Sequence, residues 1–255
     1  MKKKIAALSM AACMAASVTA CGGSKPAETT AAATEAETTA AESAAEESSA
    51  EETKAAADIE TVTPGKLTVA TSPDFAPYEF YAIGEDGTPK LAGFDMDLAQ
   101  YIADYLGLEL EVVTVDFDGV ISELQTKSVD LGMAGLSPDE KRMGIMDFSD
   151  LYYMGGQSLV TVKDNAEKYN SFEAINKPDV SVGAQVGSIQ MDLANENSPE
   201  ADIVGLPKVT DIISELLTGK MDAAYIETDV AKSYQKNYPE LTLVMDVPYD
   251  AEGSA

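Results

Sequence analysis

Ile121-Ser-Glu-Leu-Gln-Thr-Lys-Ser-Val-Asp130 aligns with Ile213-Ser-Glu-Leu-Leu-Thr-Gly-Lys-Met-Asp222, each a helix pattern that leads into a strand pattern. Six of the ten aligned positions are identical, at a constant offset of 213 − 121 = 92 residues. Two amphipathic helices can share several positions by chance, so this similarity alone is weak evidence for an internal repeat. A similar order of strands and helices surrounds both copies, and this favours two similar lobes.

Strands and helices alternate around each copy of the unit. In the first half the patterns predict strands at 66–70, 110–115 and 129–133, and helices over 94–106 and 120–127. In the second half they predict strands at 180–184 and 221–226, and helices over 188–195 and 211–218. We therefore expect an α/β protein of two lobes, with mixed, mostly parallel sheets.

The carboxyl ends of the strands are the expected ligand site. Ligands of open parallel sheets bind beyond these ends. The offset of 92 aligns Ala134-Gly135, after one strand, with Ile226-Glu227, at the end of another. Two lobes that face each other across these ends would form a cleft.

The composition excludes several classes of function. The chain has 17 Lys and Arg against 44 Asp and Glu, a net charge of −27, which argues against a nucleic-acid partner. No His is present, which excludes His triads and imidazole metal sites. The two Cys, at 13 and 21, exclude Cys zinc sites and a disulfide framework. We expect no metal and no cofactor.

The N-terminus is typical of an exported lipoprotein. A basic start, Lys2 to Lys4, precedes a short apolar run from Ile5 to Ala16 that is too short for a good transmembrane helix. Val18-Thr19-Ala20-Cys21 then resembles the bacterial lipobox, whose Cys is acylated. An ordinary cleavage site with an incidental Cys is the alternative. We expect residues 1–20 to be a signal peptide and Cys21 to hold the protein on the outer face of the membrane.

The sequence divides the mature chain into a tether and two lobes. Residues 21–60 are rich in Ala, Glu, Thr and Ser and contain no aromatic residue, which predicts a disordered acidic tether. An Ala/Glu-rich helix is the alternative. We assign 61–162 to lobe 1, 163–248 to lobe 2, and 249–255 to the start of a crossing back to lobe 1, whose remainder we expect in a longer chain.

Six motifs follow one another along the folded part. They are Thr71-Ser-Pro-Asp-Phe-Ala-Pro-Tyr-Glu-Phe80, Gly93-Phe-Asp-Met-Asp-Leu98, Phe117-Asp-Gly-Val-Ile121, Val129-Asp-Leu-Gly-Met-Ala-Gly-Leu-Ser-Pro-Asp-Glu-Lys-Arg142, Asp147-Phe-Ser-Asp-Leu-Tyr-Tyr153 and Met221-Asp-Ala-Ala-Tyr-Ile-Glu227. In order and spacing they resemble family 3 of the type II solute-binding proteins. The resemblance implies a type II periplasmic-binding-protein fold. It also implies that the protein captures a polar amino acid, with a basic or amide side chain among the options, and delivers it to an ABC permease.

The resemblance implies two charged ligand contacts. Arg142 stands at the family's carboxylate-binding position, where a planar guanidinium can bind both oxygens. A surface Arg is the alternative. Glu227 aligns with the family's ammonium-binding Asp and keeps its charge, although a solvated Glu is common in so acidic a chain.

The resemblance also implies seven further contacts with the ligand. They are Ser72, Phe75, Phe117, Gly135, Ser137, Ser188 and Ile189. The two Phe would be apolar walls, with a core role as the alternative, and Ser137 and the amides around Gly135 would be donors. Free amides at a helix N-terminus favour an anion, and only the backbone amide of Ile189 carries over from the family pattern. Members that bind basic side chains often have Asp at the position of Ser72.

Two other functions remain open. Prephenate or arogenate (cyclohexadienyl) dehydratases share this fold, and Glu227 is the one plausible general acid for such an enzyme here. A sensory ectodomain that binds an amino acid is the third option. We expect a binding protein and not an enzyme.

Overall fold

The computed structural model describes residues 59–249 and 253–255. The expected signal peptide, Cys21 and nearly all of the expected tether lie outside the described residues. Within the described part of the chain, no helix combines the length and apolarity that a bilayer span requires.

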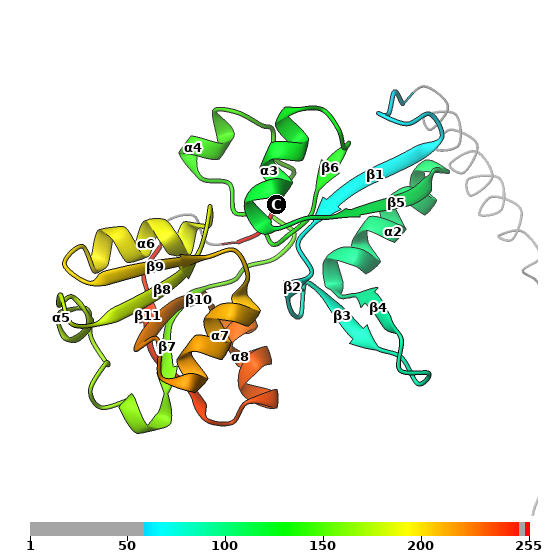
Figure 1. The fold of residues 1–255 in the computed structure, drawn as a ribbon. Coiled ribbons are helices and arrows are strands. Elements are labelled where there is room, and N and C mark those ends of the chain that lie inside the picture. Colours follow the sequence, from blue (N-terminus) through cyan, green and yellow to red (C-terminus); the bar gives the residue numbers. More distant parts are fainter. Residues whose placement is uncertain (1–58, 250–252) are drawn as a thin grey trace, which may run out of the picture. The chain divides into compact units, whose positions relative to one another are not determined.

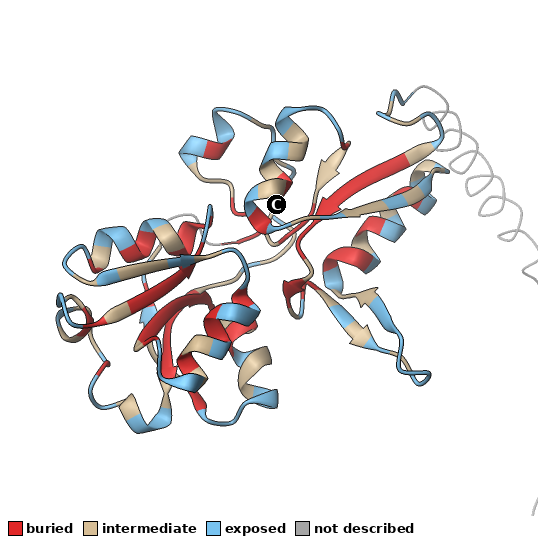
Figure 2. Ribbon diagram, viewed as in Figure 1, coloured by how far each residue is buried: buried red, intermediate tan, exposed pale blue. Residues whose placement is uncertain are grey.

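A parallel three-stranded sheet forms the centre of lobe 1 (Figure 1). Its order is β5 (Glu109–Thr114), β1 (Lys66–Thr71) and β6 (Leu131–Gly132). The central strand is buried along nearly its whole length (Figure 2), as expected of a strand covered on both faces. Two helices connect the strands, α2 (Phe94–Leu106) and α3 (Phe117–Gln125). These crossovers make all three strands end at the same edge.

A small antiparallel sheet that the sequence patterns did not predict lies between β1 and α2. It consists of β2 (Asp74–Phe75), β3 (Glu79–Ile83) and β4 (Pro89–Ala92). The two ends of this insertion meet at Gly93, where a Cβ would lie 2.1 Å from the Tyr78 carbonyl oxygen. Because Gly93 also has φ 129°, glycine is required for this close approach.

A mixed five-stranded sheet forms the centre of lobe 2. Its order is β11 (Leu241–Val247), β7 (Gln157–Val162), β10 (Ala223–Glu227), β8 (Ser181–Gln185) and β9 (Asp202–Leu206). Strand β8 is parallel to both of its neighbours, whereas β7 is antiparallel to both of its own. The helices of this lobe are α5 (Phe172–Ile175), α6 (Ile189–Asn197), α7 (Val209–Thr218) and α8 (Thr228–Asn237), with a 3₁₀ turn η2 (Lys163–Asn165).

The expected fold class is confirmed, with one correction to the lobe boundary. Each predicted helix and strand is present, although the strand expected at 129–133 is reduced to β6. The boundary expected between residues 162 and 163 does not coincide with the sheets. Strand β7 precedes this expected boundary but pairs with β10 and β11, because its buried side chains pack in the core of lobe 2.

The insertion in lobe 1 packs against lobe 2. Phe75 and Tyr78 share one buried apolar cluster with residues of α7, among them Val209 and Ile212. The amide of Val209 donates to the Asp74 carboxylate, and the Tyr234 hydroxyl of α8 donates to the Asp74 carbonyl oxygen at 2.7 Å. The two lobes therefore touch through apolar and polar contacts at this edge.

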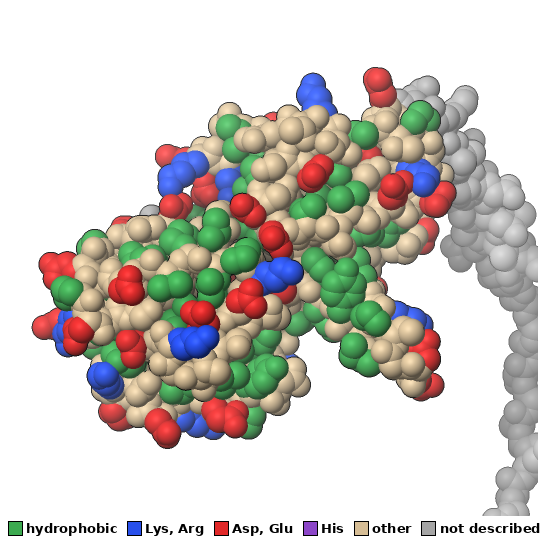
Figure 3. Space-filling model, viewed as in Figure 1, with side chains coloured by type: hydrophobic (Ala, Val, Ile, Leu, Met, Phe, Trp, Pro, Cys, Tyr) green, Lys and Arg blue, Asp and Glu red, His purple; other side chains and the backbone are tan. Residues whose placement is uncertain are grey.

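On the face drawn in Figure 3, Asp and Glu side chains are spread out and do not gather in one patch. Figure 3 shows them across the drawn face of both lobes, with Lys and Arg between them. A dispersed negative charge keeps a protein soluble and by itself defines no binding face.

Candidate functional site

One cavity is lined by residues of both lobes. The space between its lining atoms is about 380 Å³, including solvent at its mouth. Seven of the nine residues predicted to contact ligand line it: Phe75, Phe117, Gly135, Ser137, Arg142, Ile189 and Glu227. The cavity lies at the carboxyl ends of strands, where the sheet rule places ligands.

The other two predicted contacts, Ser72 and Ser188, do not line this cavity. The Ser72 hydroxyl donates to an Asp74 oxygen at 3.1 Å and lines a separate surface depression. Ser188 is the N-cap of α6, where its hydroxyl donates to the Gln185 carbonyl oxygen at 2.7 Å and accepts from the Met191 amide at 3.3 Å. Both hydroxyls therefore hold local structure.

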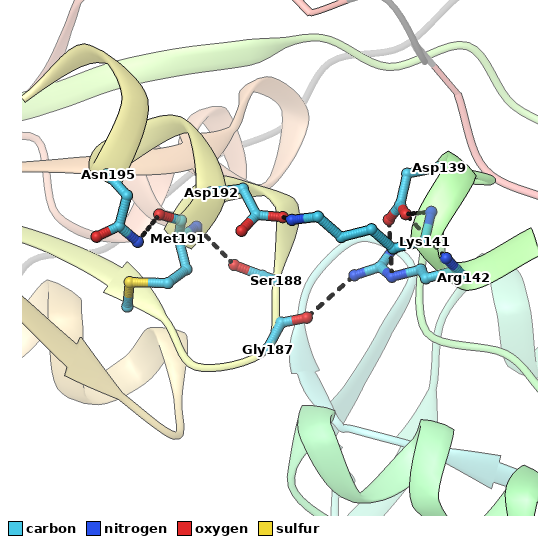
Figure 4. Close-up of polar contacts among 8 residues, drawn as sticks. All are labelled: Asp139, Lys141, Arg142, Gly187, Ser188, Met191, Asp192 and Asn195. Atoms are coloured by element: carbon cyan, nitrogen blue, oxygen red, sulfur yellow. Dashed lines mark hydrogen bonds and ion pairs between the residues drawn. The ribbon is translucent and has the colours of Figure 1, made fainter. Parts of the chain in front are cut away.

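Arg142 is buried, with 6% of its surface exposed. It lies in a single helical turn, α4 (Glu140–Met143), whose N-cap is Asp139. Its Nε lies 3.2 Å from the Asp139 carboxylate, and Nη2 donates to the Gly187 carbonyl oxygen at 3.1 Å (Figure 4). Nη1 donates to the Ser137 carbonyl oxygen at 3.0 Å. Burial lowers the pKa of Arg142, and Asp139 opposes that shift. Each Nη carries two N–H groups, so donors remain for an anion.

An ionic contact joins the lobes beside Arg142. The Lys141 Nζ lies 2.7 Å from the Asp192 carboxylate in the first turn of α6 (Figure 4). Both side chains are more than half exposed, so this pair contributes little stability. Its position shows that α4 and α6 face each other across the mouth.

Glu227 is a buried acid with one oxygen unpaired. It ends β10, is 6% exposed, and its Oε2 accepts from the Val230 amide at 2.7 Å. Its Oε1 has no hydrogen-bond partner in the part of the chain that the structure describes. Burial raises the pKa of Glu227 to about 7. A buried carboxylate oxygen without a donor is costly, so this atom is suited to receive a donor from a ligand.

Tyr78 completes this end of the cavity. Its hydroxyl likewise has no partner among the described residues, and burial raises its pKa. A Cβ on Gly155 would lie 2.7 Å from the free Glu227 oxygen and 3.3 Å from the Tyr78 hydroxyl. Glycine at 155 thus leaves space beside two unpaired polar atoms.

Gly135 lines the cavity, but its amide does not serve it. The N–H donates to the Asp95 Oδ2 at 3.0 Å, which corrects the expectation that the amide of Gly135 is a free donor for the ligand. Gly135 has φ 56°, and a Cβ there would lie 2.9 Å from the Phe75 ring. The residue therefore has to be small, and its orientation is set by Asp95, which does not line the cavity.

The N-terminus of α6 supplies donors near Arg142. Helix geometry leaves the first amides of a helix without a partner four residues back, and Ile189 is the first residue of α6. Such amides carry the positive end of the helix dipole and favour an anionic group. Arg142 and the start of α6 together form the electropositive end of the cavity.

Seven residues of the lining were not among the nine predicted contacts. They are Tyr78, Gly155, Gln157, Gln185, Gln190, Gly253 and Ser254. Gln157 lies directly opposite Glu227 in the β7–β10 register, so recognising β7 would have found it. Gln185 ends β8, and the strand-end rule could have selected it. The Gln190 amide nitrogen donates to the Gln157 amide oxygen at 2.8 Å.

Across residues 59–249 and 253–255, no group of three or more Cys, His, Asp or Glu side chains could hold a metal ion. The chemistry of the cavity instead comes from one cation, one acid with a free oxygen, backbone amides and apolar walls. These features define a class, the two-lobed α/β proteins that bind a small polar ligand between their lobes.

The chain belongs to the bacterial extracellular solute-binding proteins, family 3, whose family model matches residues 67–242. The arginine-binding extracellular protein ArtP of Bacillus subtilis is 34% identical over 194 residues, 74% of this chain and 72% of that protein. An amino acid ABC transporter substrate-binding protein, AbpA of Streptococcus pneumoniae, has been solved bound to L-arginine. It superposes with a TM-score of 0.72 at 35% identity, over 75% of this chain and 80% of that one.

An enzyme is also among the relatives. A cyclohexadienyl dehydratase of Pseudomonas aeruginosa is 29% identical over 180 residues, 71% of this chain and 66% of that protein. The proteins similar to this chain therefore include both binding proteins and an enzyme.

Proposed function

We propose that this protein is the substrate-binding component of an ABC importer and captures a free amino acid between its lobes. One observation carries the proposal. Arg142 and the half-unpaired carboxyl of Glu227 are both buried in the same cavity, one from each lobe. A free amino acid carries a carboxylate and an ammonium group on one carbon atom, and these match the cation and the acid of the cavity.

The ligand's two charged groups would take opposite ends of the cavity. The carboxylate would receive N–H donors from Arg142 and from the first amides of α6. The ammonium would donate to the free Glu227 oxygen, with the Tyr78 hydroxyl beside it. The rings of Phe75 and Phe117 would cover the apolar part of the ligand.

L-arginine is our first candidate for the ligand. Two relatives are linked to arginine: ArtP is named an arginine-binding protein, and AbpA has been solved bound to L-arginine. Gln157, Gln185 and Gln190 line the cavity and offer amide oxygens, which can accept from a guanidinium without a further buried charge. Ser72, where an acid would be expected for a basic ligand, does not reach the cavity.

The membrane context is also part of the proposal. Cys21 would carry the lipid, the tether would let the lobes reach a permease, and the protein would act on the outer face of the membrane. The lipobox-like residues and the acidic, Ala-rich segment 21–60 support this arrangement.

The experiment is a thermal-shift screen of the twenty amino acids, followed by calorimetric titration of each one that stabilises the protein. A ligand that binds only the native state adds about 2.7 kcal/mol to apparent stability at a hundredfold excess over Kd. We expect the largest shift with L-arginine. A protein that no amino acid stabilises, but that converts prephenate, would instead be a dehydratase with Glu227 as its acid.

A further inference from the structure

Glu79 is a buried acid that the proposed ligand contacts do not use. It begins β3, is 0% exposed, and neither of its carboxyl oxygens has a hydrogen-bond donor among the described residues. The charged groups that act on it are Asp95 of α2 and Asp74 of β2, and both are acids. A fully buried carboxylate with no donor and no cation nearby would be very costly, so Glu79 is neutral.

Asp95 is held next to Glu79, because its backbone amide donates at 2.9 Å to the carbonyl oxygen of Tyr78, the residue that precedes Glu79. Unlike the Glu79 carboxyl, the Asp95 carboxylate has several donors. Its carboxylate accepts from the Gly135 amide at 3.0 Å and from the Tyr152 hydroxyl at 3.1 Å. It also lies in the first turn of α2, a 13-residue helix whose dipole favours negative charge there. These donors and the helix dipole make Asp95 the ionised partner. The protonated carboxyl of Glu79 can then donate a further hydrogen bond to the Asp95 carboxylate.

We propose that Glu79 and Asp95 form a proton-sharing carboxyl pair that positions Gly135 in the wall of the ligand cavity. The inference rests on the proposed function, because Gly135 matters only if a ligand occupies that cavity. Both acids are positioning residues: neither lines the cavity, and they act on it through the Gly135 amide.

The pair connects three parts of lobe 1. Glu79 belongs to β3, Asp95 to α2, and Gly135 to the loop after β6. The backbone amide of Asp95 donates to the Tyr78 carbonyl oxygen at 2.9 Å, which holds the start of α2 against β3. The orientation of Gly135 therefore depends on a helix, α2, whose start is bonded to Tyr78, a residue of the cavity that directly precedes β3.

The protonation states make the pair sensitive to pH. Burial raises the pKa of Glu79 well above its usual 4.5, and Asp95 and Asp74 raise it further. Burial also raises the pKa of Asp95, while the donors Gly135 and Tyr152 oppose that shift. Glu79 is protonated in the native state and ionised in the unfolded state above 4.5. Its contribution to stability is therefore complete at acid pH and is lost as pH rises.

The first test compares L-arginine affinity by calorimetry in paired variants. Asp95→Asn should weaken binding about tenfold or more, since Gly135 loses a charged acceptor. Asp97→Asn is the matched control, because Asp97 lies exposed in the same first turn, and it should bind within threefold of wild type. Glu79→Gln, whose amide can donate to Asp95, should also stay within threefold, and Glu79→Leu should resemble Asp95→Asn. Equal affinities for Asp95→Asn and Asp97→Asn would overturn the proposal.

The second test needs no ligand and separates this inference from the proposed function. In the apo protein the Gly135 amide should exchange slowly with solvent, and Asp95→Asn, but not Asp97→Asn, should accelerate that exchange at least tenfold. The unfolding midpoint of Glu79→Gln should gain on that of wild type as pH rises from 5 to 8. If no amino acid binds but both results hold, the proposed function fails and the pair stands. Unchanged Gly135 exchange in Asp95→Asn, or a constant midpoint difference for Glu79→Gln, overturns the pair.

Discussion

The guanidinium of Arg142 donates from Nη2 to the backbone oxygen of Gly187 at 3.1 Å, so a side chain of lobe 1 binds the loop that starts α6 in lobe 2 (Figure 4). The bond places the proposed anion-binding cation next to the electropositive end of that helix. Closure of the lobes and capture of a carboxylate would thus use the same residue. This relationship predicts that another positively charged residue cannot replace Arg142 without loss of ligand affinity.

Arg142→Lys should weaken amino-acid binding about tenfold or more. A single ammonium cannot donate at once to the Ser137 and Gly187 oxygens and to both oxygens of a ligand carboxylate. Calorimetric titration measures the effect. Lys141→Ala is the matched control, because the exposed Lys141–Asp192 pair contributes little, and this variant should bind within threefold of wild type. Similar losses in both variants would mean that overall positive charge, and not the fork of Arg142, determines affinity.

Amino-acid affinity should fall as pH drops below about 7. Burial raises the pKa of free Glu227 to about 7, whereas an ammonium ligand requires the ionised form. Below that pH the carboxyl must release a proton for the ligand to bind, so Kd should rise by up to about tenfold per pH unit. Titrations between pH 5 and 8 test this. Glu227→Gln should bind weakly with a flat profile, and a wild-type affinity that increases toward acid pH would refute the role of Glu227.

Gly93→Ala should destabilise the protein by about 3 kcal/mol or more. The new methyl group would lie 2.1 Å from the Tyr78 carbonyl oxygen, in addition to the strain of φ 129°. Gly107→Ala is the control, because Gly107 has φ 67° with no atom within 4 Å of a Cβ, and it should cost about 1–2 kcal/mol. Denaturant unfolding of both variants decides the point. Equal stability losses would show that the close approach at Gly93 is unimportant.

Cys21→Ala should release the protein from the membrane and leave its ligand affinity unchanged. Cys21 is 66 − 21 = 45 residues before the first strand, β1, so the anchor and the cavity should be independent. Fractionation of cells that express each form, followed by titration of the released protein, provides the measurement. Retention of Cys21→Ala in membranes after a high-salt wash would contradict lipid attachment at this residue.

The repeated unit in the sequence aligns two residues that line one cavity. Its offset of 92 aligns Gly135 with Glu227, and both residues line the same cavity. Hydrophobic periodicity identifies strands and helices, and the strand-end rule then selects residues at their carboxyl ends. These two steps do not depend on side-chain detail.

Other parts of the site could not be predicted because they depend on tertiary contacts. Strand β7 carries Gln157 but runs antiparallel to its neighbours in lobe 2. The alternation of strand and helix that indicates parallel strands therefore does not predict it. The acceptor of the Gly135 amide is Asp95, forty residues earlier in the chain, and no local pattern connects them. Ser188 was expected at the ligand but caps α6, because a hydroxyl at a helix start is most easily satisfied by the helix itself.

The most direct test of the account is calorimetric titration of L-arginine into wild type, Arg142→Ala, Glu227→Gln and the double variant. Each single change should cost about 2–5 kcal/mol of binding free energy, because it leaves a desolvated ligand charge unpaired. That range is a loss of about thirty- to several-thousand-fold in affinity. The unfolding midpoints of the apo forms should change much less than the affinities. Binding of both single variants within threefold of wild type would contradict the claim that Arg142 and Glu227 hold opposite ends of one amino acid.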